Sequence, residues 1–350
     1  MNGLPKAERQ RLGALLEHSS QEEVMSAIPQ FAQAEIHNNC AAASEAPESL
    51  GMLVFNMERG VHLDELTDFL MHCPDVQPYD VILANELDDG CARSGQKDTT
   101  RELAQRLNMN YVFGLEFIEL ANGEDAKGHH GNAILSRWPI RRAKVVRLPE
   151  QYNWYFDRQK RIGGRLAILA ELDVNGKSVG VGTIHLENRT HGDGRAAQME
   201  AILQEADAMF SGMPVILGGD LNTNTFDGRD KAAIAQIASD PALQRRCLED
   251  VSRFEACLPL AEKYGYRAVS DFENCDSAVT RRKPLPGGGH LNLRLDWLLV
   301  RGAHAAQGRN ITTRRESWPF APAESALERF GGRELSDHNA VWANCLLNKQ

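Results

Sequence analysis

The sequence has 350 residues, of which 42% are hydrophobic and 25% are charged, the proportions of an ordinary globular protein. This length is sufficient for one large domain or two small ones. The formal net charge of -9 argues against a protein held on nucleic acid by a general basic field, although a local basic rim is compatible with an acidic whole.

Residues 5 to about 37 have the apolar spacing of helices, and a stretch rich in small residues follows at 40–51. We therefore predict an N-terminal helical extension with a linker over residues 1–48 and a second unit over residues 49–350. No segment has the length and apolar composition of a membrane span, and the N-terminus has no signal-peptide core. The seven scattered cysteines include no C-x-x-C pair and indicate buried thiols in a reducing compartment. We expect a cytoplasmic protein without a membrane span.

From residue 53 onward, short apolar segments alternate with helical ones, and strands recur without a second linker. Helical spacing is clear at 62–73 and 194–210. Strands are predicted at 53–57, 81–87, 132–136, 166–174, 179–186, 214–221, 295–300 and 340–347. Asn175-Gly176 joins two of these strands and predicts a tight hairpin, because the pair supplies both positive-φ residues of a type I′ turn. A hairpin requires antiparallel pairing, which disfavours a purely parallel fold.

Residues that can bind a hard cation or a phosphate lie at or near the carboxyl ends of six predicted strands. They are Asn56, Glu86, His185, Asp220 with Asn222, Asp296, and Asp337 with His338. Strands that end at one rim would gather these side chains into one cleft. Carboxylate and amide oxygens without thiolates suit Mg²⁺ or Mn²⁺, and the histidines can exchange protons near neutral pH.

Each of these residues also has an ordinary structural role when it is considered alone. Asp220 and Asn222 could form a turn with an Asx cap, and His185 could be a hydrogen-bonded core residue. Asp337 could cap a helix, and Glu86 could belong to a solvated acidic loop. The joint pattern, in order and at strand ends, favours a phosphate-ester site.

These segments resemble the ordered motifs of the endonuclease/exonuclease/phosphatase superfamily. The resemblance is carried by Asn56, Asn85-Glu86, GNAILSR at 131–137, Thr183 to Glu187, GGDLNT at 218–223, Asp296, and SDH at 336–338. It spans residues 51–346 and leaves residues 1 to about 48 outside. The family usually has Gln where this chain has Asn85. The resemblance implies a DNase I-like α/β fold, a four-layer α/β/β/α sandwich of two mixed, mainly antiparallel sheets flanked by helices.

The resemblance also implies a metal site. Glu86 would be the principal Mg²⁺ ligand, with Mn²⁺ as the alternative ion, and Asn56 would lie beside the metal and the substrate. Asp337 would be a further ligand. Glu58, two residues beyond Asn56 on the same strand face, is an auxiliary candidate.

For the reaction itself, the resemblance implies that Asp220 and Asn222 orient the attacking water and contact the phosphate. His185 would donate a hydrogen bond to a phosphoryl oxygen, and His338, paired with Asp296, would transfer the proton. A carboxylate behind a histidine raises its pKa and selects its tautomer. No G-x-S-x-G elbow or nucleophilic cysteine signature is present, so direct attack by water is the simpler hypothesis.

Two further features concern the substrate. Arg165, just after Gly163-Gly164, is a candidate phosphate clamp near the rim. The segment 153–161 mixes aromatic and cationic residues, as a loop that stacks on bases or holds a phosphate would. A solvated loop with a packed Trp explains this composition at least as well.

The leading hypothesis is a Mg²⁺-dependent phosphodiesterase, of nuclease or head-group type, whose partner is a phosphate-ester substrate. One alternative is a phosphatase of small or inositol-type phosphomonoesters, and another is a catalytically silent binding module. Because one scaffold serves many substrates, substrate choice is expected in the loops at 90–100, 150–165 and 270–292.

Overall fold

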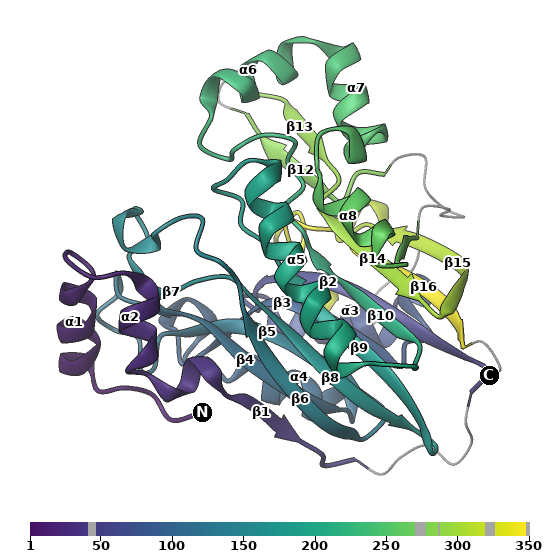
Figure 1. The fold of residues 1–350 in the computed structure, drawn as a ribbon, viewed down its shortest axis with the longest axis horizontal. Coiled ribbons are helices and arrows are strands. Elements are labelled where there is room, and N and C mark those ends of the chain that lie inside the picture. Colours follow the sequence, from purple (N-terminus) through teal and green to yellow (C-terminus); the bar gives the residue numbers. More distant parts are fainter. Residues whose placement is uncertain (41–46, 270–277, 286–287, 319–325, 348–350) are drawn as a thin grey trace.

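The computed structural model describes residues 1–40, 47–269, 278–285, 288–318 and 326–347. Two β-sheets pack face to face, and helices cover their outer faces (Figure 1). The linker predicted near residue 40 and the loop at 270–292 lie partly outside the described residues.

The first sheet has the strand order β1-β4-β5-β3-β2-β16-β15, with β7 also paired to β4. Its strands are β1 (Ala34–His37), β2 (Ser49–Arg59), β3 (Val81–Asp89), β4 (Asn110–Glu119), β5 (His129–Ser136), β7 (Arg161–Gly163), β15 (Ala303–Ile311) and β16 (Ala340–Leu347). Only β2 and β3 pair in parallel among the described strands of this sheet.

The second sheet has the order β11-β14-β10-β9-β8-β6. Its strands are β6 (Ile140–Arg147), β8 (Leu166–Val174), β9 (Lys177–His185), β10 (Val215–Asp220), β11 (Arg267–Ala268) and β14 (Asp296–Arg301). Here β9 and β10 form the parallel pair, because α5 (Gly192–Met209) connects them. A separate hairpin, β12 (Arg281–Pro284) and β13 (His290–Leu293), lies beside α6 (Lys231–Ser239) and α7 (Pro241–Glu249) (Figure 1).

Three apolar cores define the layers. Between the sheets, Val54 and Leu83 of the first sheet pack with Ile168 and Ile216 of the second. Outside the first sheet lie α3 (Leu63–His72), α4 (Thr99–Leu107) and the short α9 (Ala326–Arg329), and outside the second lie α5 and α8 (Cys257–Lys263). This order of helix, sheet, sheet and helix confirms the predicted four-layer sandwich of mixed, mainly antiparallel sheets.

The N-terminal residues form α1 (Lys6–Leu15), α2 (Gln21–Ser26) and the strand β1, which the helical spacing did not predict. The helix α2 begins with a capping box between Ser20 and Glu23. The expectation of helical structure up to residue 37 is wrong at its end, because residues 34–37 pair with β4 as an edge strand. Leu12 and Phe31 also belong to the core outside the first sheet, so this segment shares a core with the rest of the molecule.

All eight predicted strands and both predicted helices are present, and so is the hairpin. Asn175 and Gly176 have φ values of 50° and 89°, and the pairing of Val174 with Lys177 leaves a two-residue loop. The turn therefore sets the register of β8 against β9, which places Leu166 opposite His185.

Candidate active site

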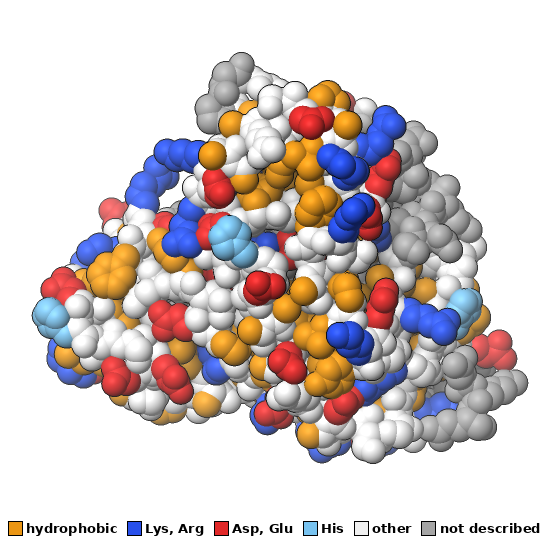
Figure 2. Space-filling model, turned by 45° about the horizontal axis from the view of Figure 1, so that its top comes forward, with side chains coloured by type: hydrophobic (Ala, Val, Ile, Leu, Met, Phe, Trp, Pro, Cys, Tyr) orange, Lys and Arg blue, Asp and Glu red, His pale blue; other side chains and the backbone are white. Residues whose placement is uncertain are grey.

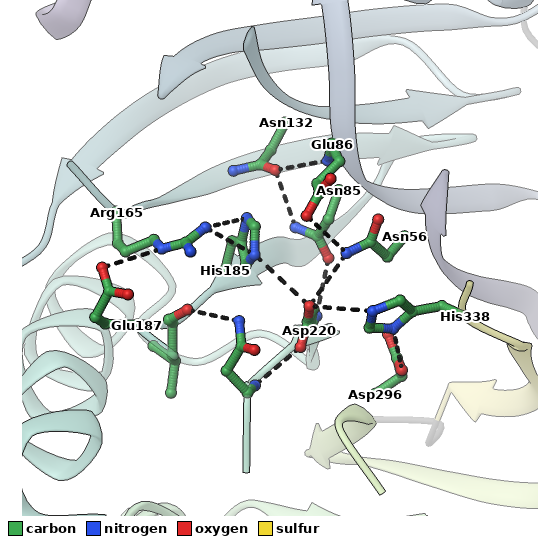
Figure 3. A network of polar contacts seen from close by, with 12 residues as sticks. Asn56, Asn85, Glu86, Asn132, Arg165, His185, Glu187, Asp220, Asp296 and His338 are labelled. Carbon is green, nitrogen blue, oxygen red and sulfur yellow. Dashed lines mark hydrogen bonds and ion pairs between the residues drawn. The ribbon is translucent and has the colours of Figure 1, made fainter. Parts of the chain in front are cut away.

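One row of the second sheet carries three of the predicted catalytic residues. Asp220, the last residue of β10, pairs in register with His185 at the end of β9 and with Asp296 at the start of β14. Neighbours in register on adjacent strands share a face of a sheet, so regular pairing alone brings the three side chains together (Figure 3).

His338 approaches this row from the chain just before β16. Its Nδ1 lies 2.8 Å from Oδ2 of Asp296, and its Nε2 lies 3.8 Å from Oδ2 of Asp220. Burial alone would lower the pKa of His338, but the carboxylates of Asp296 and Asp220 raise this pKa to about 10. The imidazole is therefore held as a cation near neutral pH, with a proton on Nε2 next to Asp220.

His185 is held from behind by two charged residues. Its Nδ1 lies 3.0 Å from Oε2 of Glu116, and its Nε2 lies 2.8 Å from Nη1 of Arg165 and 3.6 Å from Oδ2 of Asp220. Burial would raise the pKa of Glu116, but His185 and Arg165 lower this pKa to about 2. Both ring nitrogens of His185 thus have protein partners.

Arg165 lies deep in this network rather than at a free rim. Its Nη1 donates to Oε1 of Glu116 at 2.9 Å, and its Nε donates to Oε2 of Glu187 at 3.3 Å. The residue is 6% exposed, and it still lines the pocket beside the site. This geometry gives Arg165 a positioning role toward His185, and its role as a phosphate clamp stays a proposal.

The first sheet presents its residues differently, through irregularities in its strands. The pairing of β2 with β3 shifts between Asn56 and Arg59, and that of β3 with β5 shifts between Ala84 and Leu87. Glu58 and Glu86 lie inside these bulges with φ values of 44° and 55°. Left-handed backbone is costly for residues other than glycine and is concentrated at functional sites, and bulges redirect side chains there. Glu58 therefore does not simply share a strand face with Asn56, as the alternation predicted.

Glu86 is an ionised carboxylate with few partners. Its Oε1 lies 3.4 Å from Nδ2 of Asn56, a long contact for a hydrogen bond. Burial would raise the pKa of Glu86, but Arg59 and the nearby His130, His185 and His338 hold it well below the ordinary value. A half-buried carboxylate that stays ionised and has few hydrogen-bond partners fits a hard divalent metal.

Asn56 links the two sides of the site. Its Nδ2 also lies 3.1 Å from Oδ2 of Asp220, so one amide touches both the Glu86 and the Asp220 carboxylates. The donor atoms of Asp220, Asp296 and His338 lie within 4.8 Å of one another and form a candidate metal cluster among the described residues. This cluster differs from the predicted ligand set of Glu86, Asn56, Asp337 and Glu58. One oxygen of Asp296, Oδ1, is buried without a hydrogen-bond partner in the described part of the chain.

Asp337 and Glu58 lie together at the outer edge of the site. The backbone N–H of Asp337 donates to Oε2 of Glu58 at 3.0 Å, and the Asp337 carboxylate pairs with Arg281. Burial and the Asp337 charge raise the pKa of Glu58. Asn222, on the opposite side, has a φ of 47°, and its Nδ2 donates to the backbone oxygen of Leu186 at 2.9 Å. Its backbone N–H donates to Oδ1 of Asp220 at 2.9 Å, which orients that carboxylate.

Sequence reasoning missed several residues that support the site. Asn85, read only as a mild replacement for Gln, donates to Ile184 O at 3.2 Å and accepts from the N–H of Asp220 at 2.9 Å, so it ties the two sheets together. Asn132 accepts from the N–H of Glu86 at 3.2 Å. Glu116 had one available signal, since it is a lone acid within an apolar segment at 111–118. Trp154, in the mixed loop, donates from Nε1 to Glu187 at 2.8 Å.

Comparison with known proteins agrees with this geometry. The model of the endonuclease/exonuclease/phosphatase family matches residues 53–338. The chain belongs to this family. Membership supports hydrolysis of phosphoesters in general, and the family generally uses divalent metals. No match is found among curated proteins.

Solved structures of this family share the fold. An endonuclease/exonuclease/phosphatase from Beutenbergia cavernae is 19% identical, with a TM-score of 0.54, over 86% of this chain and 72% of that one. The human Nocturnin catalytic domain with bound sulfate is 14% identical, with a TM-score of 0.54, over 91% and 98% of the two chains. A Bacteroides vulgatus protein named for the same family is 13% identical, with a TM-score of 0.51, over 86% and 99%. Among the described residues, no helix is both long and apolar enough to cross a bilayer.

Proposed function

We propose that this protein is a Mg²⁺-dependent phosphodiesterase that cleaves its substrate by direct attack of water. The proposal depends on two kinds of group that meet at Asp220. The charged pair of His338 and Asp296 lies next to it. The Glu86 carboxylate, which has few partners, is linked to it through the amide of Asn56. Acid–base groups and a metal-binding carboxylate meet there in one site.

The chain's own residues divide the work between them. Asp220 accepts a proton from the attacking water, since its Oδ2 faces Nε2 of His185, at 3.6 Å, and Nε2 of His338, at 3.8 Å. His338 holds a proton on Nε2 and donates it where negative charge develops, while Asp296 orients the ring. Asn222 and His185 contact the phosphate from the second sheet.

Glu86 would hold the metal, with Asn56, Asp337 and Glu58 as its nearest supporting groups. When bound, a divalent cation offsets the charge of the phosphate and of the leaving oxygen. Glu86 itself is held in place by Asn132, which fixes the backbone of its bulge.

A phosphomonoesterase is the second candidate, because six arginines line the pocket next to Glu86 and suit a substrate of higher negative charge. The catalytically silent alternative is weakened by the complete set of acid, base and metal-binding groups in contact with one another.

The test is hydrolysis by the purified protein, with Mg²⁺ and with EDTA, across plasmid DNA, single-stranded RNA, sphingomyelin, inositol phosphates, an aryl phosphodiester and an aryl phosphomonoester. We expect cleavage only with the metal, a preference for diesters, and no cleavage by Asp220→Ala or His338→Ala. His304→Ala, which changes an exposed histidine on β15, is the matched control and should retain full activity. If nothing is cut although Mg²⁺ binds, the binding-module reading replaces this proposal.

A further inference from the structure

A pocket of about 540 Å³ is lined by Glu86 but not by His185, Asp220, Asp296 or His338. Six arginines line it, against four acidic residues. The arginines are Arg59, Arg158, Arg161, Arg165, Arg189 and Arg281, and we call this the arginine pocket. Such an excess of positive charge is unusual in a chain whose net charge is -9, and it marks a place for an anion. Figure 2 shows Lys and Arg side chains between the N-terminal helices at the left and the upper part of the molecule.

The arginines are gathered around one indole ring. The guanidinium carbons of Arg161, Arg165 and Arg189 lie 5.2, 5.3 and 5.6 Å from the centre of the Trp154 ring. Like charges that share one ring repel each other, and the aromatic face and a few carboxylates offset this repulsion. An anionic ligand would relieve the remaining repulsion.

Much of the hydrogen-bonding capacity of these arginines is unused. The Nε atoms of Arg59, Arg161, Arg189 and Arg281 are buried and have no acceptor within the described residues. Arg161, which is 4% exposed, uses Nη2 for both of its polar side-chain partners, Gln159 at 2.7 Å and Glu119 at 3.0 Å. A guanidinium presents five donors in a planar fork, and phosphate oxygens match this geometry.

Arg158 and Arg189 form the outer part of the pocket. Arg158 is exposed, and the described part of the chain offers its side chain no ion pair. Besides its contact with Trp154, the Arg189 side chain makes one ion pair among the described residues, with Asp157 at 3.3 Å. The positive field reaches the neighbouring hairpin, where burial, followed by the charges of Arg281 and Arg189, lowers the pKa of Lys283. Phe156, 66% exposed, also lines the pocket and offers a flat surface to a planar ring.

We propose that the arginine pocket binds a second phosphate of the substrate, next to the phosphate that is hydrolysed, and that the substrate is a nucleotide whose base packs on Phe156. The proposal rests on the proposed function, since it defines which phosphate esters the site prefers. The second phosphate can come from a small nucleotide bisphosphate or from the 5′ end of a nucleotide chain, and the experiment separates these sources.

The first measurement is calorimetric binding of adenosine 5′-monophosphate to the full chain in EDTA, where no hydrolysis occurs. We expect binding that Arg158→Ala and Arg189→Gln each weaken about tenfold, the usual effect of losing a charge-assisted hydrogen bond. Arg282→Ala is the matched control, because Arg282 is the exposed neighbour of Arg281 on β12 and does not line the pocket. The absence of binding, or equal binding by all the variants, would overturn the proposal. Arg158 is exposed and has no ion pair with the described residues, so its variant should fold normally.

The second measurement compares substrates that share the same scissile ester, with Mg²⁺ present. We expect kcat/KM to be at least tenfold higher for the dinucleotide pTpT than for TpT, and this ratio should fall about tenfold in Arg189→Gln. A similar preference for adenosine 3′,5′-bisphosphate over adenosine 3′-monophosphate would show that the pocket accepts small nucleotides. Without that preference, the pocket would be assigned to the 5′ end of a nucleotide chain. Equal kcat/KM values within the dinucleotide pair and within the adenosine phosphate pair would overturn the proposal. If no substrate is hydrolysed while the binding result holds, the proposed function fails and the phosphate subsite stands.

Discussion

The two sheets bring their residues to the site in different ways. The second sheet uses regular pairing, which places His185, Asp220 and Asp296 in one row across three neighbouring strands. The first sheet uses bulges, where Glu58 and Glu86 take left-handed backbone conformations. Proton transfer requires groups close to one another, and pairing in register places Nε2 of His185 3.6 Å from Oδ2 of Asp220. Oxygen atoms that surround an ion must converge from several directions, which a flat strand does not provide.

The comparison predicts its largest effect at His338, which approaches the row of the second sheet. His338→Ala should lower kcat about a thousandfold, because it removes the proton held beside Asp220. Steady-state kinetics on the best substrate would measure this, with His304→Ala as the control. A loss of less than tenfold would contradict the role of His338.

Asp296→Asn tests the same pair through pH. The carboxylate of Asp296 raises the pKa of His338 to about 10, so the imidazole loses its proton only at high pH. Neutralising this partner should lower the pH at which kcat falls on the alkaline side. A pH profile that does not move would show that the pair is not the acid in turnover.

A smaller effect is expected from the bulge of the first sheet. Glu86→Gln keeps the shape of the side chain but removes its charge, so it should weaken Mg²⁺ binding about 10- to 100-fold. High Mg²⁺ should restore part of the activity of Glu86→Gln, but it should not restore the activity of His338→Ala. Titration of activity with metal measures the difference, and an unchanged Mg²⁺ requirement would shift the ligand role to Asp220, Asp296 and His338.

Glu116 tests the support behind His185 through stability. Its pKa is about 2 in the folded protein and near the ordinary value of 4.5 in the unfolded chain. A lowered pKa stabilises the fold above the unfolded value, and this stabilisation is lost as the pH falls from about 4.5 toward 2. The carboxylate thus contributes about 3 kcal/mol at neutral pH, to order of magnitude. Glu116→Gln should therefore be less stable at pH 7 and lose less stability on acidification.

Denaturant unfolding at several pH values measures this, and Glu205→Gln, at an exposed ion pair with Lys144, is the control. An acid dependence in Glu116→Gln as steep as in the wild type would show that Glu116 is not an important source of it.

The smallest effect is expected in the hairpin that sets the register of β9. Gly176 has a φ of 89° and open space around it, so Gly176→Ala adds strain without a clash. We expect a loss of about 1 kcal/mol in the free energy of unfolding. Gly331→Ala is matched, since its added Cβ also meets nothing within 4 Å but its φ is not positive. Equal losses in the two variants would mean that the turn conformation is not the cause.

The amino-acid sequence by itself determined the strands that carry Asn56, Glu86, His185, Asp220 and Asp296, because apolar runs and turn residues act locally. It also determined the family, since the motifs keep their order along the chain. It did not reveal β1, a four-residue edge strand whose pairing with β4 depends on a distant partner.

Only the tertiary structure decided which polar residues meet. Glu116 and His185 are 69 positions apart in the chain, and Asn85 and Asp220 are 135 apart, yet each pair is in contact. The roles of Trp154 and its three arginines likewise depend on where loops from different elements come together. Local sequence patterns predict the conformation and burial of single helices and strands. Electrostatic contacts between the two sheets depend on register, bulges and packing, which form only when the whole chain folds.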